Sequence, residues 1–266
     1  MIIWGTKEVR RRLGYVADFC PLCRDLRAFE VTRVGMAGHI YYLSFGEGQL
    51  AGYNRTCCTC GTALNAAPDS YKTLGERLLP VAELAAQTFP NLKEAYAARL
   101  ALEKSLRNPL ARIEPGERAA LLKEPFILLS PRVEQRFNST HFDWQTLAAF
   151  FGGFLVGMPL IIALVEALLP SIKDEAVLVA IGAVVVATGA QMALAGGRWM
   201  RKQLFPILVP ALLPLKPTPA ELETVLKDMK TLGRKIGSKV RLADLLEAMQ
   251  SHGAAARAAP GSVPAL

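Results

Sequence analysis

Residues 144–165 read WQTLAAFFGGFLVGMPLIIALV, and residues 176–197 read AVLVAIGAVVVATGAQMALAGG. Neither stretch contains a charged side chain, and a helix needs about 20 mostly apolar residues to cross the hydrocarbon core of a bilayer. The sequence PSIKDE at 170–175 is too short for a domain but long enough for a turn at the membrane surface. We therefore expect a transmembrane helical hairpin over 144–197, with helices at 144–167 and 176–197.

Charge is distributed unevenly along the chain. Residues 144–197 carry four charged side chains, whereas the other 212 residues carry 50, about 24%, which is close to the usual share in soluble domains. The composition indicates a soluble protein interrupted by an apolar insert. It excludes disorder of the whole chain, because 52% of all residues are hydrophobic. A buried hairpin inside a soluble core is the alternative interpretation of the insert.

The residues that flank the insert predict its orientation. Trp144 and Trp199 stand at its two ends, where aromatic side chains commonly lie at the bilayer surface. Arg198, Arg201 and Lys202 follow the second helix, whereas the connecting turn carries one lysine and two acids. By the positive-inside rule both soluble parts face the cytoplasm. We expect a multi-pass protein of a bacterial-type inner membrane with the N- and C-termini in the cytoplasm.

Small residues recur along both expected membrane helices. Gly153 and Gly157 form a GxxxG pattern in the first helix, and Gly189, Ala193 and Gly197 continue the pattern in the second. Small side chains allow helix backbones to approach closely within lipid. The pattern is explained either by packing within the hairpin, which we favour, or by contact with a helix of another chain.

Four of the five cysteines form two CxxC pairs, Cys20-Pro-Leu-Cys23 and Cys57-Cys58-Thr59-Cys60. Each tight turn presents two thiolates on one side, and four thiolates complete the tetrahedral shell of a structural zinc. Cys58 has no cysteine three residues after it, so we interpret it as a non-ligand.

The sequence between the pairs predicts a small antiparallel sheet. Residues 26–34 and 39–45 are rich in β-branched and aromatic side chains, and glycines at 35 and 38 predict a turn between them. Glycines at 46 and 48 predict the next turn, and residues 52–56 a short third strand.

With a knuckle at each end of this sheet, residues 2–64 resemble the zinc-ribbon family, and the resemblance covers this N-terminal part only. It implies that Cys20, Cys23, Cys57 and Cys60 hold one structural zinc ion. Arg24 departs from the pattern, because such knuckles often carry glycine at this position.

The whole chain is predicted to be an α+β membrane protein made of five parts. They are a β zinc ribbon at 1–66, a cytoplasmic helical connector at 67–143, the transmembrane hairpin at 144–197, a juxtamembrane segment with amphipathic cytoplasmic helices at 198–252, and a disordered tail at 253–266.

Prolines and caps predict the ends of several helices. Ser130-Pro131 pairs a cap residue with proline at the first helical position, so we expect a helix to begin there. Three prolines interrupt the apolar residues 204–215, which we expect not to form a regular helix. Thr218–Glu221 reads as a capping box and predicts a helix that ends at Gly233.

The sequence predicts no enzyme, because it contains no phosphate loop, nucleophile elbow or paired-carboxylate motif. The residues outside the insert carry a net charge of +10, which favours the anionic surface of a bilayer. The expected partners are the membrane lipid bilayer and a membrane protein or a second copy of the chain. No small-molecule substrate is evident, and nucleic acid is the less favoured partner.

The resulting hypothesis is a membrane-anchored zinc-ribbon adaptor or accessory subunit that presents a cytoplasmic protein-interaction platform within a membrane complex. The alternatives are a membrane-tethered nucleic-acid-binding regulator and an auxiliary subunit of a transporter or channel.

Overall fold

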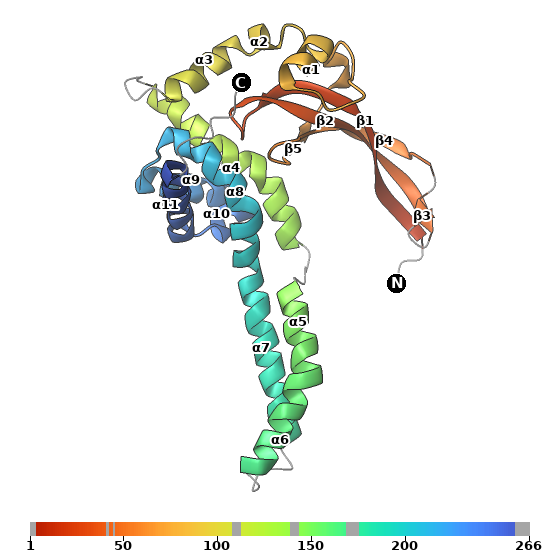
Figure 1. The fold of residues 1–266 in the computed structure, drawn as a ribbon, viewed down its shortest axis with the longest axis vertical. Coiled ribbons are helices and arrows are strands. Elements are labelled where there is room, and N and C mark those ends of the chain that lie inside the picture. The colour runs from red at the N-terminus through yellow and green to blue at the C-terminus, as the bar shows by residue number, and fades with distance from the viewer. Residues whose placement is uncertain are drawn as a thin grey trace. The chain divides into compact units, whose positions relative to one another are not determined.

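The structure is a computed structural model that describes residues 4–40, 43–44, 46–107, 113–138, 144–168 and 176–258. An N-terminal antiparallel sheet is followed by helices (Figure 1), so the α+β class is confirmed at this level. The chain divides into two compact units, and the division falls inside four of the helices. The first unit comprises Met1–Leu128, Ile207–Leu222 and Met249–Leu266, and the second Leu129–Pro206 and Glu223–Ala248.

The sheet belongs to the first unit, and neighbouring strands are antiparallel in the order β1-β2-β4-β5, with β3 paired to the end of β2. The strands are β1 (Trp4–Cys20), β2 (Asp25–Ile40), β3 (Leu43–Ser44), β4 (Gln49–Cys57) and β5 (Ala63–Asn65).

The turn predicted at Gly35 and Gly38 is wrong, because β2 continues through both residues. The strand β1, which the sequence did not reveal, supplies a partner along the whole length of β2, with Val9 opposite Gly35. Gly35 is required there for a different reason: a Cβ would collide with the carbonyl of Glu47. The turn predicted at Gly46 and Gly48 is confirmed, and both have positive φ angles, of 70° and 66°.

Helix α1 (Val81–Thr88) packs on the β1–β2 hairpin, and it is followed by α2 (Leu92–Ala95) and α3 (Ala97–Leu106). Ala17, Ala28 and Leu84 are buried together at this contact. The Thr88 hydroxyl donates to the Leu84 carbonyl and accepts the N–H of Ala17 at 3.2 Å, so one side chain joins the helix to β1.

Helix α4 (Pro115–Asn138) runs continuously past Ser130 and Pro131, so the helix start predicted there is wrong. Leu122, Phe126, Leu129 and Val133 recur at intervals of four, three and four residues, and each is at most 2% exposed. Burial of this apolar face outweighs the hydrogen bond that proline removes from a helix.

The apolar residues 204–215 are also helical, contrary to expectation. They comprise α8 (Phe205–Leu212), which has Pro210 in its interior, and a 3₁₀ turn at Leu213–Leu215. The segment buries an apolar face, with Leu208 and Leu212 fully inaccessible to solvent and Pro210 exposed, and this burial stabilises a helix that proline alone would disfavour.

The capping box at Thr218–Glu221 is confirmed at the start of α9 (Pro219–Thr231). The Thr218 N–H donates to the Glu221 carboxylate at 2.7 Å, and the Glu221 N–H donates to the Thr218 hydroxyl at 3.3 Å. Gly233 has a positive φ of 70° just beyond the helix, as expected of a helix C-terminus. Next come α10 (Lys235–Lys239) and α11 (Leu242–Ala258). Helix α11 thus extends into the predicted tail, and residues 259–266 lie outside the described residues.

Two stretches in the described part of the chain are long and apolar enough to cross a membrane, Trp144–Leu164 and Val177–Leu215. The first begins with α5 (Trp144–Gly152) and continues into α6 (Met158–Leu168), and the second begins with α7 (Ala176–Trp199). Their apolar side chains are largely exposed in the isolated chain. The turn predicted at 170–175 lies outside the described residues.

A π-helical turn precedes a proline in each of these stretches. Gly153–Gly157 lies before Pro159, and Met200–Leu204 lies before Pro206. In the first turn the N–H of Met158 bonds to the carbonyl of Gly153, five residues back. The extra residue widens the turn and so accommodates the proline ring, which would otherwise meet the carbonyl four residues before it.

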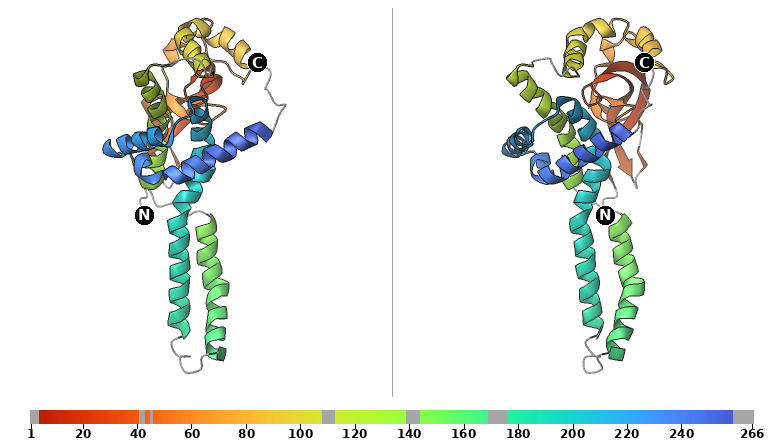
Figure 2. Two further views of the ribbon diagram at one scale, coloured as in Figure 1. Left: turned by 90° about the vertical axis from the view of Figure 1, so that its left-hand side faces the viewer. Right: turned by 60° about the vertical axis from the view of Figure 1, so that its left-hand side comes forward.

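The two apolar stretches lie side by side as an antiparallel helical hairpin (Figure 2). Gly153 contacts the second helix so closely that a Cβ would lie 3.1 Å from the Cγ1 of Val184. Val184 and Ala180 are buried on this side of α7. Gly153 therefore serves packing within the hairpin, whereas a Cβ at Gly189 would meet no atom within 4 Å.

Candidate metal centre

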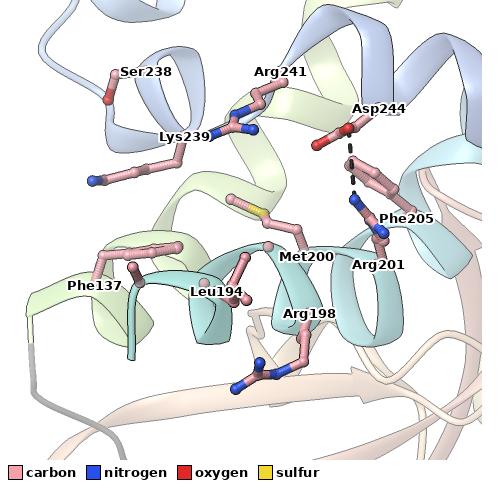
Figure 3. Close-up of a pocket in the computed structure, with 13 residues that line it drawn as sticks. Phe137, Leu194, Arg198, Met200, Arg201, Phe205, Ser238, Lys239, Arg241 and Asp244 are labelled. Carbon is pink, nitrogen blue, oxygen red and sulfur yellow. Dashed lines mark ion pairs between the residues drawn. The ribbon is translucent and has the colours of Figure 1, made fainter. Parts of the chain in front are cut away.

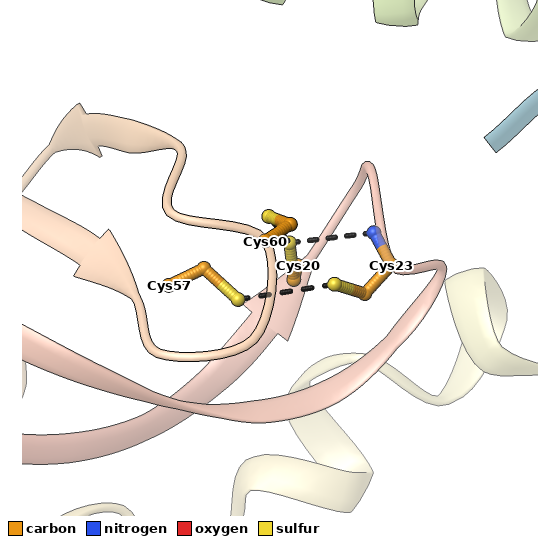
Figure 4. Close-up of side chains that lie close together, drawn as sticks. All are labelled: Cys20, Cys23, Cys57 and Cys60. Atoms are coloured by element: carbon orange, nitrogen blue, oxygen red, sulfur yellow. Dashed lines mark hydrogen bonds between the residues drawn. The ribbon is translucent and has the colours of Figure 1, made fainter. Parts of the chain in front are cut away.

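Pairing in the sheet brings the two CxxC turns together. Cys20 ends β1 opposite Asp25 of β2, and Cys57 ends β4 opposite Phe29 of the same strand. Because β2 lies between β1 and β4, both turns fall at the same end of the sheet (Figure 4). The Cys58 N–H donates to the Ala28 carbonyl at 2.9 Å and holds the second turn against β2.

The four expected ligands form one cluster. The Sγ atoms of Cys20 and Cys60 are 3.7 Å apart, those of Cys23 and Cys57 are 3.8 Å apart, and all four lie within 4.8 Å of one another. A tetrahedron with Zn–S distances near 2.3 Å requires sulfur atoms about 3.8 Å apart, whereas a disulfide needs about 2.05 Å. The four cysteines are thus placed to bind one metal ion, and the spacing is compatible with zinc.

The backbone conformation of each CxxC turn suits the binding of a metal ion by its sulfur atoms. Gly61 has a φ of 68°, and its N–H bonds to the Cys57 carbonyl at 2.9 Å. The Cys23 N–H points at the Cys20 sulfur, 3.4 Å away. Such N–H donors stabilise negative charge on sulfur.

Contact between the thiols changes their acidity. Hydrogen bonds from Cys20 and then Cys23 lower the pKa of Cys57, and those from the same two residues lower the pKa of Cys60 to about 6. Hydrogen bonds with Cys23 and then Cys57 raise the pKa of Cys20, and the pKa of Cys23 is raised as well. Without a metal ion two thiols thus hold their protons and donate to the other two, and the thiolate is the form of cysteine that ligates a metal ion.

Arg24 connects the first turn to helices. Its backbone is left-handed, with a φ of 53°, and its side chain is only 3% exposed. The guanidinium donates to the Glu103 carboxylate of α3 at 3.1 Å, to the Ala211 carbonyl of α8 at 2.6 Å and to the Leu121 carbonyl of α4 at 3.3 Å. Arg24 thereby ties the cysteine cluster to parts of three helices that belong to the first unit.

The sequence predicted neither Glu103 nor a second buried acid, Asp18, two residues before Cys20. The Asp18 carboxylate accepts the Tyr71 hydroxyl and pairs with Arg55. Burial raises the pKa of Tyr71, which keeps this hydroxyl protonated as a donor. The one available signal was Arg24 itself, at a position where glycine was expected.

Cys58 is exposed and lies outside the cluster. Among the described residues, no histidine or carboxylate joins the four sulfurs. Comparison of the chain with protein-family models, with curated proteins and with solved structures found no match.

Proposed function

We propose that this chain is a membrane-anchored zinc-ribbon adaptor, a non-enzymatic accessory subunit that presents a cytoplasmic protein-interaction platform within a membrane complex. The observation that carries the proposal is the cluster of four sulfurs, tied by Arg24 to α3, α4 and α8 in a chain that also has two exposed apolar helices.

The proposed metal is one structural zinc ion held by Cys20, Cys23, Cys57 and Cys60. Four thiolates fill a tetrahedral shell and leave no position for water or substrate. The sulfur spacing of 3.7 and 3.8 Å supports such a closed site. The metal would then stabilise the fold rather than take part in a reaction.

The proposed location is a bacterial-type inner membrane, with the hairpin spanning the bilayer and both termini in the cytoplasm. The exposed apolar surface of α5, α6 and α7 supports a lipid environment, because such surface is unfavourable in water. Arg198, Arg201 and Lys202 at the end of the second span support the orientation. A cytoplasmic sheet would also keep its thiols reduced.

An adaptor is favoured over a nucleic-acid-binding regulator because much of the positive charge on the sheet is paired within the chain. The strand arginines in ion pairs with carboxylates are Arg10, Arg11, Arg27, Arg33 and Arg55. Such pairing reduces the charge available for phosphates. An auxiliary subunit of a transporter or channel differs from the proposed adaptor only in the identity of its partner.

Affinity purification of the full chain in mild detergent tests the proposal. We expect a membrane protein in stoichiometric amount, or a homo-oligomer of the chain itself. The Cys20→Ser variant should lose this partner yet stay in the membrane fraction, and Cys58→Ser should retain it. A monodisperse monomer without a partner would contradict the adaptor.

A further inference from the structure

A cavity of about 520 Å³ lies in the second unit, where α7 passes from its apolar part to its basic end (Figure 3). The end of α4, the last turns of α7 and the π-helical turn Met200–Leu204 form one side. Helix α10 and the start of α11 form the other. The predicted adaptor function makes no use of this cavity.

The polar side chains that line the cavity are mostly positively charged. Arg201, Lys239 and Arg241 line it together with a single carboxylate, Asp244. Arg201 and Asp244 are 3.8 Å apart, and the arginine side chain is 68% exposed, so this pair is weak. The lining guanidinium of Arg198 is engaged with Gln191 on the same helix at 2.8 Å. Even without Arg198, cations outnumber the carboxylate by two.

The part of the cavity lined by α7 also contains apolar and small residues. Ala193, Leu194 and Gly197 line it, and a Cβ at Gly197 would meet no atom within 4 Å. Ala193 and Gly189, one and two turns before Gly197 on α7, are both exposed. The hairpin contact at Val184 lies on another side of the helix, so a strip of small residues leads along α7 into the cavity.

The aromatic side chains beside the cavity mark the level of a membrane surface. Phe137 lines it, with the Lys239 ammonium 5.3 Å from its ring centre and the Trp199 ring edge-on at 6.1 Å. Tryptophan is enriched where apolar lipid meets the headgroups. Along the chain the exposed small residues of α7 come first, then Trp199 beside Phe137, and then Arg201, which is the order of an acyl chain, its glycerol region and a phosphate.

We propose that this cavity binds an anionic phospholipid, with its phosphate diester on Lys239, Arg241 and Arg201 and an acyl chain on the Gly189–Ala193–Gly197 strip. Charge complementarity supports a phosphate, because arginine and lysine bind phosphate oxygens through charge-assisted hydrogen bonds. The lipid site requires α7 to lie in a bilayer, but it requires no partner protein. Its test can therefore succeed or fail independently of the test of the proposed adaptor function.

Calorimetric titration of the full chain in maltoside micelles tests the lipid site. The probes are dioctanoyl phosphatidylglycerol, dioctanoyl phosphatidylcholine and inorganic phosphate. We expect phosphatidylglycerol to bind saturably at one per chain, about tenfold more tightly than phosphatidylcholine. The variant Lys239→Gln/Arg241→Gln should weaken that binding by about tenfold.

A matched control removes the same charge outside the cavity. Lys202→Gln/Lys227→Gln should change phosphatidylglycerol affinity by less than about threefold. An equal loss of affinity in both double variants would mean that the lipid is attracted by surface charge in general, and would overturn the site. Gly197→Leu should weaken phosphatidylglycerol binding by filling the space beside Gly197 in the cavity. Inorganic phosphate binding as tightly as the lipid, or a Gly197→Leu variant that changes only the oligomeric state, would overturn the lipid assignment.

Discussion

Arg24 departs from the zinc-ribbon pattern, and the contacts of its side chain explain the departure. A left-handed backbone costs a residue with a Cβ roughly 1–2 kcal/mol, which is why glycine is favoured after such a turn. Here the side chain offsets that cost, because it reaches Glu103 and two helix carbonyls in a buried site. The position therefore combines a turn of the metal centre with a contact between the sheet and the helices.

Removing the Glu103 carboxylate should show how much the stability of the fold depends on the Arg24–Glu103 pair. In the Glu103→Ala variant the Arg24 guanidinium stays buried without an anion, which typically costs about 3–5 kcal/mol. We expect a loss of that size in the free energy of unfolding, measured by urea titration in detergent. Glu8→Ala, which breaks an exposed pair with Arg10, should cost about 1 kcal/mol at most; equal losses would contradict the role given to Arg24.

Four of the cysteines are placed to bind one metal ion and Cys58 lies outside their cluster, and metal analysis tests this division. Cys20→Ser should lower the zinc content from about one ion per chain to about none, because three remaining thiolates no longer close the shell. Cys58→Ser should retain the metal, since this side chain is exposed outside the cluster. Elemental analysis after purification in reducing buffer gives both numbers, and a wild-type protein without zinc would refute the site.

At the scale of elements, local signals predicted the capping box at Thr218–Glu221 and the turn at Gly46 and Gly48, but not which prolines a helix tolerates. The box at Thr218 and Glu221 was predictable because its hydrogen bonds join residues three apart. Pro131 and Pro210 lie inside helices because their neighbours are buried, and that burial depends on residues far away in the sequence. The length of β2 was missed for the same reason, since it depends on β1.

The ionised carboxylate of Glu221 makes the free energy of unfolding depend on pH. A hydrogen bond from Arg118 lowers the pKa of Glu221 from its ordinary value of 4.5 to about 2. A carboxyl group with a lowered pKa stabilises the fold above its unfolded-state pKa, and this contribution is lost as the pH falls from about 4.5 to about 2. Glu221→Gln should therefore cost about 1 kcal/mol at pH 7 and progressively less in that range.

Urea unfolding of the wild type and Glu221→Gln across this pH range measures the effect. Glu223→Gln, two residues further along α9, removes a carboxylate that takes no part in the box and should stay within about 0.5 kcal/mol of the wild type at every pH. A cost of Glu221→Gln that is unchanged at pH 2 would contradict the assignment to its ionised form.

At the scale of the molecule, the sequence predicted the features whose residues form short motifs or uninterrupted runs in the chain. Two CxxC pairs predicted the cysteine cluster, and 22-residue apolar runs predicted the helices that match a membrane in length. The Arg24–Glu103 pair and the cavity beside Lys239 were not predictable, because each joins residues from several elements. Their presence depends on tertiary packing, which single-residue patterns do not encode.

The proposed topology makes Cys58 a native reporter of the side on which the sheet lies. Its thiol is exposed, whereas a bound metal would protect the four cysteines of the cluster. In a bacterial host, a membrane-impermeant maleimide should label Cys58 in inside-out vesicles and not in intact spheroplasts. Cys58→Ser should remain unlabelled in both, and adding Ser171→Cys between the two spans should restore labelling in spheroplasts only. Labelling of Cys58 in spheroplasts would place the sheet outside and contradict the orientation. The C-terminal flank would then lie outside as well, because both flanks of a two-helix hairpin must face one compartment.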